Sequence, residues 1–447
     1  MNTNDLLLRW SQMSLDQIED EIRTGKDADS VEQLLGAETA LEMESLSFAP
    51  PSAGPREAVV LLPGIMGSLL SSIRGVTSLV WINPLVFLEG NARYLRLDPR
   101  GQVDACPEVE MVPVGLEKMT YLKMALALNR KVDLYEFPYD WRRPVAYNAR
   151  VLRSALRRWS SGSNRKFTLV AHSMGGLVSR SFMAQFPAEA EKRVKQLIML
   201  GTPNYGATNA IETLFSGNSL MATVDGINRM NGMTGVVRSF PGVYNLLPAP
   251  PEFFPQGRTY PASWNLYDAA SWRIAGLQQT YLDSARQLHE SLAQSDPQIP
   301  MIMIAGCHLE TLKALVSDFT VTEMPKLLTD KVSTGVDSGD GTVPLWSALL
   351  PGARTYYIRA KHADLPNNGQ VINAVLNLLE DGACALPEEL PEPRSFLGIS
   401  FDVPGMEGEV SLPEPPEEAP LPPAELRAKI RSGTASKDDL KSLRFAL

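Results

Sequence analysis

The stretch Phe167-Thr-Leu-Val-Ala-His-Ser-Met-Gly-Gly-Leu-Val-Ser-Arg-Ser-Phe182 predicts a strand, a sharp turn and a helix in direct succession. The apolar run that begins it is typical of a buried strand, and the residues from Gly175 onward are typical of a helix. Small residues, Ala171 and Gly175, stand two positions before and two positions after Ser173, where a tight turn leaves little space. Ser173 is therefore expected on a strained turn with its hydroxyl group presented to a ligand.

A serine on such a turn is the nucleophile of α/β-hydrolase enzymes, whose catalytic groups follow in the order serine, acid, histidine. The chain has four histidines, and this order excludes His172 as the base. His289 lies in a helix-like stretch and is expected on a solvated helix face. His362 opens a polar loop after a strand-like run, where a catalytic imidazole is normally carried, so it is favoured over the alternative, His308.

The acid is expected within Asp337-Ser-Gly-Asp-Gly-Thr-Val-Pro344, between the expected nucleophile and base. Glycines on both sides let the backbone bend tightly around Asp340. Its carboxylate would accept a hydrogen bond from the imidazole, fix the tautomer and stabilise the imidazolium that forms during attack. A plain turn is the alternative, since the distal glutamate of a calcium-binding EF-hand loop is absent. Asp337 and Asp364 remain alternative acids.

An oxyanion hole made of backbone amides leaves an indirect trace in the sequence. In this fold one N–H belongs to the residue after the nucleophile, here Met174. The other belongs to the loop after an early strand, and Ala58–Leu62 is an early apolar strand. It leads into the glycine-containing loop Pro63-Gly-Ile-Met-Gly-Ser68, which is expected to bring the amide of Ile65 near the acyl oxygen.

Together these pieces resemble the lecithin:cholesterol acyltransferase family, which includes lysosomal phospholipase A2 and bacterial relatives. The resemblance covers roughly Ala58 to Leu379, and the order of the motifs makes it specific. The matching motifs are Leu62-Pro-Gly-Ile-Met-Gly67, Val80-Trp-Ile-Asn83, Phe137-Pro-Tyr-Asp-Trp-Arg142, Ala171-His-Ser-Met-Gly175, Leu200-Gly-Thr-Pro203, Gly339-Asp-Gly-Thr-Val343 and His362.

By this resemblance Ser173, Asp340 and His362 are the catalytic triad. The same resemblance implies that the backbone amides of Ile65 and Met174 form the oxyanion hole. The expected chemistry needs no cofactor, and the sequence shows neither a phosphate-binding glycine loop nor a Cys/His cluster, so no nucleotide or metal chemistry is expected.

The resemblance also points to a lid and to residues near the substrate. The loop of Trp81 would correspond to the family's lid beside the acyl-binding cleft, and Trp141 is a second candidate for substrate contact. Family members brace the lid with a disulfide, whereas Cys106 is the only cysteine of this region. Asp140 and Arg142, which flank Trp141, are expected either to orient a head group or to form a buried ion pair of the scaffold.

Apolar strands alternate with helical stretches, as a mostly parallel sheet requires. The predicted fold class is therefore α/β, an α/β-hydrolase with a mostly parallel central sheet, a lid loop and a cap insertion. The predicted strands are Ala58–Leu62, Val132–Phe137, Phe167–Ala171, Lys195–Leu200, Met301–Ala305 and Thr355–Ile358.

Composition and periodicity divide the 447 residues into four parts. Each terminal part is expected to form two short helices broken at a glycine, with apolar faces too small for a core of their own. Such helices are left open to pack on the body, to pair with each other or to dock a partner protein. The parts are an N-terminal helical appendage (1–50), the hydrolase domain (51–380, lid about 68–115, cap about 204–299), a Pro/Glu-rich linker (381–423) and a C-terminal helical segment (424–447).

Charge and cysteine content limit the partners and the compartment. A net charge of −9 argues against a nucleic-acid partner. Three widely spaced cysteines suit a reducing compartment. The N-terminus lacks an export-signal pattern, and no apolar run is long enough to span a membrane. We therefore expect a cytoplasmic protein, with contact to a membrane surface left open.

These observations predict a serine hydrolase that cleaves or transfers acyl esters of lipids, most specifically phospholipids, through an acyl-enzyme. One alternative is a small-molecule carboxylesterase whose lid only shields the site. Another is a non-catalytic scaffold that binds a partner through its terminal helices. An intact serine–acid–histidine order argues against the scaffold, because a scaffold has no physical need for all three groups.

Overall fold

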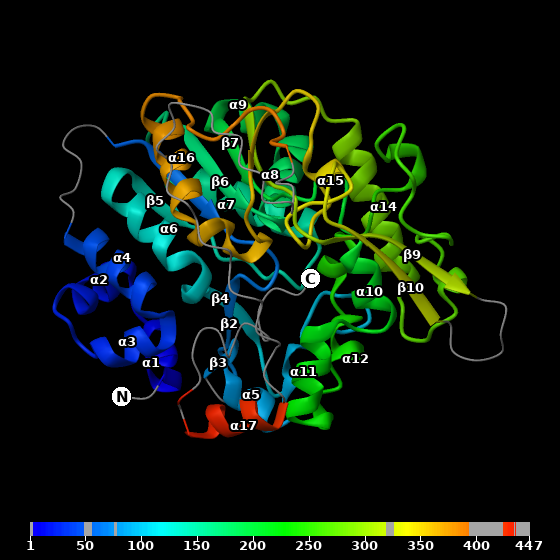
Figure 1. Cartoon of the computed structure of the whole chain (residues 1–447), viewed down its shortest axis with the longest axis horizontal. Coiled ribbons are helices and arrows are strands. Elements are labelled where there is room, and N and C mark those ends of the chain that lie inside the picture. The colour runs from blue at the N-terminus through cyan, green and yellow to red at the C-terminus, as the bar shows by residue number, and fades with distance from the viewer. Residues whose placement is uncertain are drawn as a thin grey trace, which may run out of the picture.

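The computed structural model describes residues 3–48, 56–75, 78–318, 326–392, 423–432 and 434. Its centre is a six-stranded sheet with the order β11-β8-β7-β6-β1-β5, in which all neighbouring strands run parallel (Figure 1). The predicted α/β class is confirmed, and the six predicted strands are the strands of this sheet. They are β1 (Ala58–Leu62), β5 (Asp133–Glu136), β6 (Phe167–His172), β7 (Val194–Leu200), β8 (Met301–Gly306) and β11 (Arg354–Ile358).

Both faces of the sheet are covered by helices, so its central strands are apolar on both sides. Successive side chains of a strand point to opposite faces. Val59 and Leu61 accordingly share one apolar cluster with α6 and α16, and Val60 and Leu62 share another with α7 and α8. The covering helices are α6 (Lys118–Lys131), α7 (Val145–Trp159), α8 (Met174–Gln185) and α16 (Gly369–Glu380).

The segment expected to form the lid contains a small antiparallel sheet with the order β3-β2-β4. Two short helical elements lie between β3 and β4 along the chain. The elements are β2 (Ser68–Ser72), β3 (Ser78–Trp81), α5 (Pro84–Leu88), η1 (Ala92–Leu95) and β4 (Met111–Leu116).

The segment expected to form the cap lies between β7 and β8 and is helical (Figure 1). An antiparallel strand pair that the sequence did not predict, β9 (Thr311–Asp318) with β10 (Lys326–Val332), follows β8. Two short helices, α9 (Pro187–Arg193) and α15 (Leu345–Ala348), precede β7 and β11. The helical elements of the cap segment are α10 (Asn209–Phe215), α11 (Ser219–Ile227), η2 (Arg229–Asn231), α12 (Met233–Val237), α13 (Pro241–Tyr244), η3 (Pro251–Phe253), η4 (Ala269–Trp272) and α14 (Gln279–Ala293).

The N-terminal segment folds into four helices rather than the two that the sequence suggested. They bury Trp10, Ile18 and Leu34 almost completely and join the large apolar cluster of the body. The Arg130 guanidinium on α6 donates to Glu19 and to the backbone carbonyl of Ser47, in the fourth helix of this segment. The segment therefore packs on the body through α6. The helices are α1 (Thr3–Trp10), α2 (Leu15–Arg23), α3 (Ala28–Leu35) and α4 (Ala37–Phe48).

The C-terminal helix α17 (Pro423–Ser432) lies against α5 of the lid segment and α11 of the cap segment (Figure 1). Its Leu426 and Ile430 side chains are fully buried. Residues 393–422 of the expected linker lie outside the described residues. Across the part of the chain that is described, no helix combines the length and apolar character needed to cross a bilayer.

We predict that Trp10→Ala destabilises the N-terminal helices by about 3–5 kcal/mol, because truncating a buried tryptophan leaves a cavity. The indole N–H would also be lost as a donor to Glu21 Oε2 at 3.1 Å. Urea unfolding followed by circular dichroism measures the effect. Leu41→Ala, at a position 65% exposed on α4, is the control and should change stability by less than about 0.5 kcal/mol. Equal midpoints for the two variants would contradict this packing.

Candidate active site

Ser173 lies between β6 and α8 in a conformation that L-residues rarely adopt. Its backbone angles are φ 53° and ψ −125°. Its N–H donates to the carbonyl of Leu200 on the neighbouring strand β7 at 2.8 Å. Strained backbone of this kind persists only where the surrounding structure enforces it, and it clusters at functional sites. The strained strand-to-helix turn expected from the sequence is therefore present.

The surroundings of this turn leave no room for larger residues. A Cβ atom added to Gly175 would lie 2.5 Å from the carbonyl oxygen of Pro63. A Cβ atom added to Gly64 would lie 2.8 Å from Ser173 Cβ and 3.3 Å from Ser173 Oγ. The loop after β1 thus lies directly against the serine hydroxyl.

Asp340 and His362 form a buried hydrogen-bonded pair. The imidazole Nδ1–H donates to Asp340 Oδ2 at 2.7 Å, and the side chains are only 2% and 4% exposed. Backbone N–H groups of Thr342 and Val343 donate to the other carboxylate oxygen at 3.0 and 2.7 Å. The His362 N–H donates to the Asp340 carbonyl at 2.9 Å. Both side chains are therefore held in one orientation, with imidazole Nε2 pointing away from the carboxylate.

The pair lies beside the serine turn. The imidazole rings of His362 and His172 are 4.8 Å apart between centroids, and His172 directly precedes Ser173. A Cβ atom added to Gly201, next to Leu200, would lie 3.0 Å from both Asp340 Oδ2 and His362 Nδ1. The structure thus brings the three sequence-predicted triad residues to the carboxyl ends of neighbouring strands.

Two of the alternative groups, Asp337 and His308, are bound to other partners. Asp337 pairs with Lys313 at 3.5 Å, and both side chains are about one-third exposed. His308 forms a hydrogen bond through Nε2 to the carbonyl of Pro391 at 2.7 Å. The expectation that His289 lies on a solvated helix face is wrong, because its side chain is 3% exposed and bonds the Leu247 carbonyl at 2.9 Å.

The backbone amides expected to form the oxyanion hole are available. Within the described part of the chain, the N–H groups of Ile65 and Met174 have no protein acceptor. Met174 is the first residue of α8, where helix geometry leaves the N–H without an intrahelical partner. Ile65 directly follows Gly64, which contacts the serine. Both amides can therefore donate to a ligand oxygen.

The two tryptophans expected near the substrate are buried in the scaffold. Trp81 donates its indole N–H to the Met66 carbonyl at 2.7 Å, and Trp141 donates to the Ser68 carbonyl at 3.1 Å. Their rings pack edge to face at 5.3 Å, and neither side chain is more than 1% exposed. These contacts explain how the indoles brace the loop after β1. Their role toward substrate stays a prediction.

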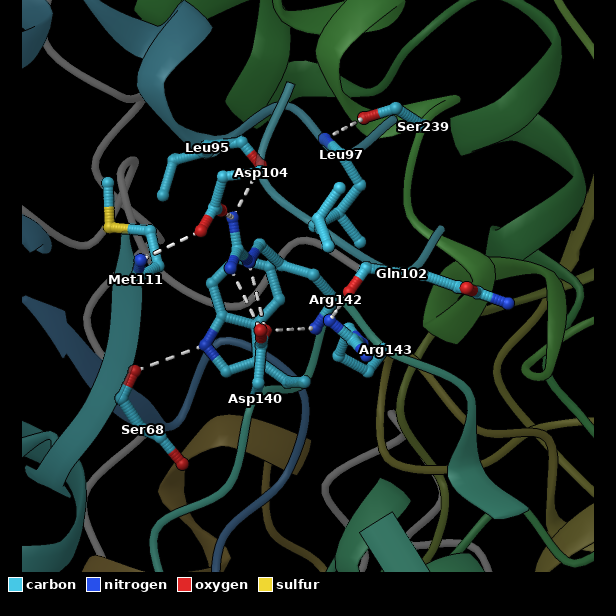
Figure 2. Close-up of polar contacts among 12 residues, drawn as sticks. Ser68, Leu95, Leu97, Gln102, Asp104, Met111, Asp140, Arg142, Arg143 and Ser239 are labelled. Atoms are coloured by element: carbon cyan, nitrogen blue, oxygen red, sulfur yellow. Dashed lines mark hydrogen bonds and ion pairs between the residues drawn. The ribbon is translucent and has the colours of Figure 1, made fainter. Parts of the chain in front are cut away.

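Arg142 forms a buried ion-pair network between the hydrolase body and the lid segment (Figure 2). Its guanidinium, 1% exposed, contacts Asp140 Oδ2 and Asp104 Oδ1, each at 2.8 Å. It also donates to the Leu95 carbonyl at 2.8 Å. Although burial acts to lower the pKa of Arg142, the two carboxylates outweigh it and raise that pKa. Of the two roles expected for Asp140 and Arg142, the geometry favours the scaffold pair.

The described residues offer no evident metal site, since no three His, Cys, Asp or Glu side chains among them are placed to hold an ion. The three cysteines are free thiols, so no disulfide braces the lid segment.

The family model of lecithin:cholesterol acyltransferase matches residues 123–296. This match confirms the family resemblance expected from the sequence motifs. It includes Ser173 and the cap segment, whereas Ile65, Asp340 and His362 lie outside it. Phospholipase A(1) LCAT3 of Arabidopsis thaliana is 24% identical over 163 residues, which are 35% of this chain and 36% of that protein. The match thus spans about a third of the length of this curated relative.

Two solved structures align with most of the chain. The Tle4-Tli4 complex aligns with a TM-score of 0.46 and 14% identity, over 73% of this chain and 99% of that chain. The mature form of the Bacillus licheniformis lipase BlEst2 aligns with a TM-score of 0.39 and 16% identity, over 74% of this chain and 94% of that chain.

We predict that Arg142→Ala costs about 3–5 kcal/mol of unfolding free energy, because it leaves two carboxylates in a buried site without their cation. Thermal or urea unfolding of the full chain measures the loss. Arg158→Ala, at an exposed position of α7, is the control and should stay within about 0.5 kcal/mol of the parent protein. Similar stabilities of the two variants would mean that the network contributes little.

Proposed function

We propose that this protein is a serine hydrolase that cleaves or transfers acyl esters of lipids. The observation that carries the proposal is the strained turn at Ser173, which lies beside the buried Asp340–His362 pair. A strained turn that carries the nucleophilic oxygen, next to an oriented imidazole, is the arrangement that nucleophilic acyl transfer uses in α/β-hydrolases. A non-catalytic scaffold would need neither the strained turn nor the oriented imidazole.

In this mechanism His362 Nε2 accepts the proton of the Ser173 hydroxyl as Oγ attacks the ester carbonyl. The imidazolium that forms is stabilised by Asp340. The amides of Ile65 and Met174 donate to the negative oxygen of the tetrahedral intermediate. His362 then gives its proton to the leaving alcohol, and an acyl-enzyme remains. Water releases a carboxylic acid from it, whereas a bound alcohol receives the acyl group.

A lipid ester, most specifically a phospholipid, is the proposed substrate. The match of residues 123–296 to the lecithin:cholesterol acyltransferase family supports this choice, as does the name of the plant relative, a phospholipase A(1). We also propose a cytoplasmic location with peripheral membrane contact, from the composition of the chain. A small-molecule carboxylesterase would use the same groups, and activity that falls as the acyl chain lengthens would favour it.

We predict that Ser173→Ala lowers ester turnover on the order of 10⁴–10⁶-fold, because nothing else supplies the nucleophile. Hydrolysis of a soluble p-nitrophenyl ester and of phospholipid vesicles measures the loss, and circular dichroism checks the fold. Ser181→Ala removes a buried hydroxyl from the same helix and should keep near-parental activity. A Ser173→Ala variant within tenfold of the parent protein would refute the assignment.

We predict that Asp340→Asn lowers turnover on the order of 10³–10⁴-fold, because an amide would favour the wrong imidazole tautomer of His362. Asp337→Asn changes the neighbouring acid, which pairs with Lys313 instead, and should cost less than about tenfold. Initial rates on the same soluble ester provide the comparison. The reverse ranking would move the acid to Asp337.

A further inference from the structure

We propose that His172 is a positioning residue that couples the loop of the catalytic base to the loop of the oxyanion hole, with Tyr121 as its partner. This inference rests on the proposed function. It concerns a histidine that the serine–acid–histidine order excludes as the base. His172 is the last residue of β6, and its side chain is fully buried beside the nucleophile.

Three hydrogen bonds link the two loops through these side chains. His172 Nε2 lies 3.0 Å from the carbonyl oxygen of His362. His172 Nδ1 lies 2.8 Å from the hydroxyl of Tyr121 on α6. The same hydroxyl accepts the backbone N–H of Gly64 at 2.8 Å. The chain of contacts therefore runs from the base loop, past the nucleophile, to the residue before Ile65.

The hydrogen-bond partners and the neutral state of His172 determine which atom carries each proton in this series of contacts. A carbonyl oxygen only accepts, so His172 Nε2 must carry a hydrogen and donate it to His362. Burial holds the pKa of His172 well below its ordinary value, and a proton on the neighbouring His362 ring would lower it further, so the ring of His172 is neutral. Its Nδ1 is then an acceptor, and the Tyr121 hydroxyl must donate to it. A lone pair of that hydroxyl is left for the N–H of Gly64.

These hydrogen bonds hold two parts of the site in place, the backbone before the Ile65 amide and the backbone of His362. Gly64 lies against both side chains of the turn, since an added Cβ atom would be 2.8 Å from Ser173 Cβ and 3.2 Å from His172 Nδ1. Tyr121 thus sets the position from which the next amide, that of Ile65, points at the reacting carbonyl. His172 holds the backbone of His362 from the other side. Positional errors of a fraction of an ångström at such groups lower the rate of the chemical step.

The primary test compares two buried tyrosine hydroxyls, each of which donates one hydrogen bond and accepts one backbone N–H. Tyr121→Phe removes the link in the proposed chain. Tyr244→Phe removes a cap hydroxyl that donates to the Arg238 carbonyl at 2.9 Å and accepts the Gln278 N–H at 3.4 Å. We expect Tyr121→Phe to lower kcat roughly 10–100-fold on a soluble ester with KM changed less than about twofold. Tyr244→Phe should keep kcat within about twofold.

Equal losses of kcat in both variants would reduce Tyr121 to a general structural role and overturn the inference. Unchanged kcat in Tyr121→Phe would overturn it as well. Ser173→Ala, measured in parallel, separates this failure from failure of the proposed function. If turnover depends on Ser173 but not on Tyr121, only the coupling through Tyr121 and His172 is refuted. If turnover does not depend on Ser173, the proposed hydrolase function is refuted as well.

Variants of His172 keep the inference testable if Tyr121→Phe does not fold. The amide of His172→Gln offers both a donor for His362 and an acceptor for Tyr121, whereas the side chain of His172→Leu offers neither. We expect the glutamine variant to retain at least about tenfold more kcat than the leucine variant. In the parent protein, nitrogen-15 NMR at pH 7 should show His172 as the neutral Nε2–H tautomer. Equal kcat values for the two His172 variants, or an Nδ1–H tautomer of His172 in the parent protein, would contradict the proposed hydrogen-bond directions.

Discussion

The backbone strain at Ser173 is the constraint on which the rest of the site depends. A residue at φ 53° and ψ −125° relaxes unless its neighbours prevent it. Here the hydrogen bond to Leu200 ties the turn to the central sheet. The carbonyl oxygens of Leu62, at the end of β1, and of Pro63, in the loop that follows, lie where Gly175 would carry a side chain. The sheet and this loop thus enforce the strained conformation of Ser173, which is only 5% exposed.

Distant segments converge on the same small volume because the carboxyl ends of parallel strands meet at one edge of the sheet. β1 leads into the loop of Ile65, β6 into Ser173, and the region after β11 into His362. The indoles of Trp81 and Trp141 donate hydrogen bonds to the carbonyls of Met66 and Ser68 and so hold the first of these loops. The buried Arg142 network joins this edge to the lid segment. Rigidity at the site therefore comes from polar contacts between segments, added to the apolar core.

The sequence predicted what depends on local patterns. Apolar runs locate all six strands of the central sheet, and small residues around Ser173 locate the turn. It missed contacts between residues far apart in the chain, such as that of Tyr121 with His172, which only packing creates. The error at His289 had a readable signal. This residue continues the apolar helix face of Leu282, Ala285 and Leu292, which argues for burial.

The residue that a covalent serine-directed inhibitor modifies tests most directly whether Ser173 is the nucleophile. The full-length protein is treated with a fluorophosphonate, digested, and mapped by mass spectrometry. We predict one stoichiometric adduct, on Ser173, because only a serine activated by a neighbouring base reacts readily. The adduct should be absent from the Asp340→Asn variant at matched times. Labelling of another serine, or no labelling of the folded protein, would contradict a hydrolase built on this turn.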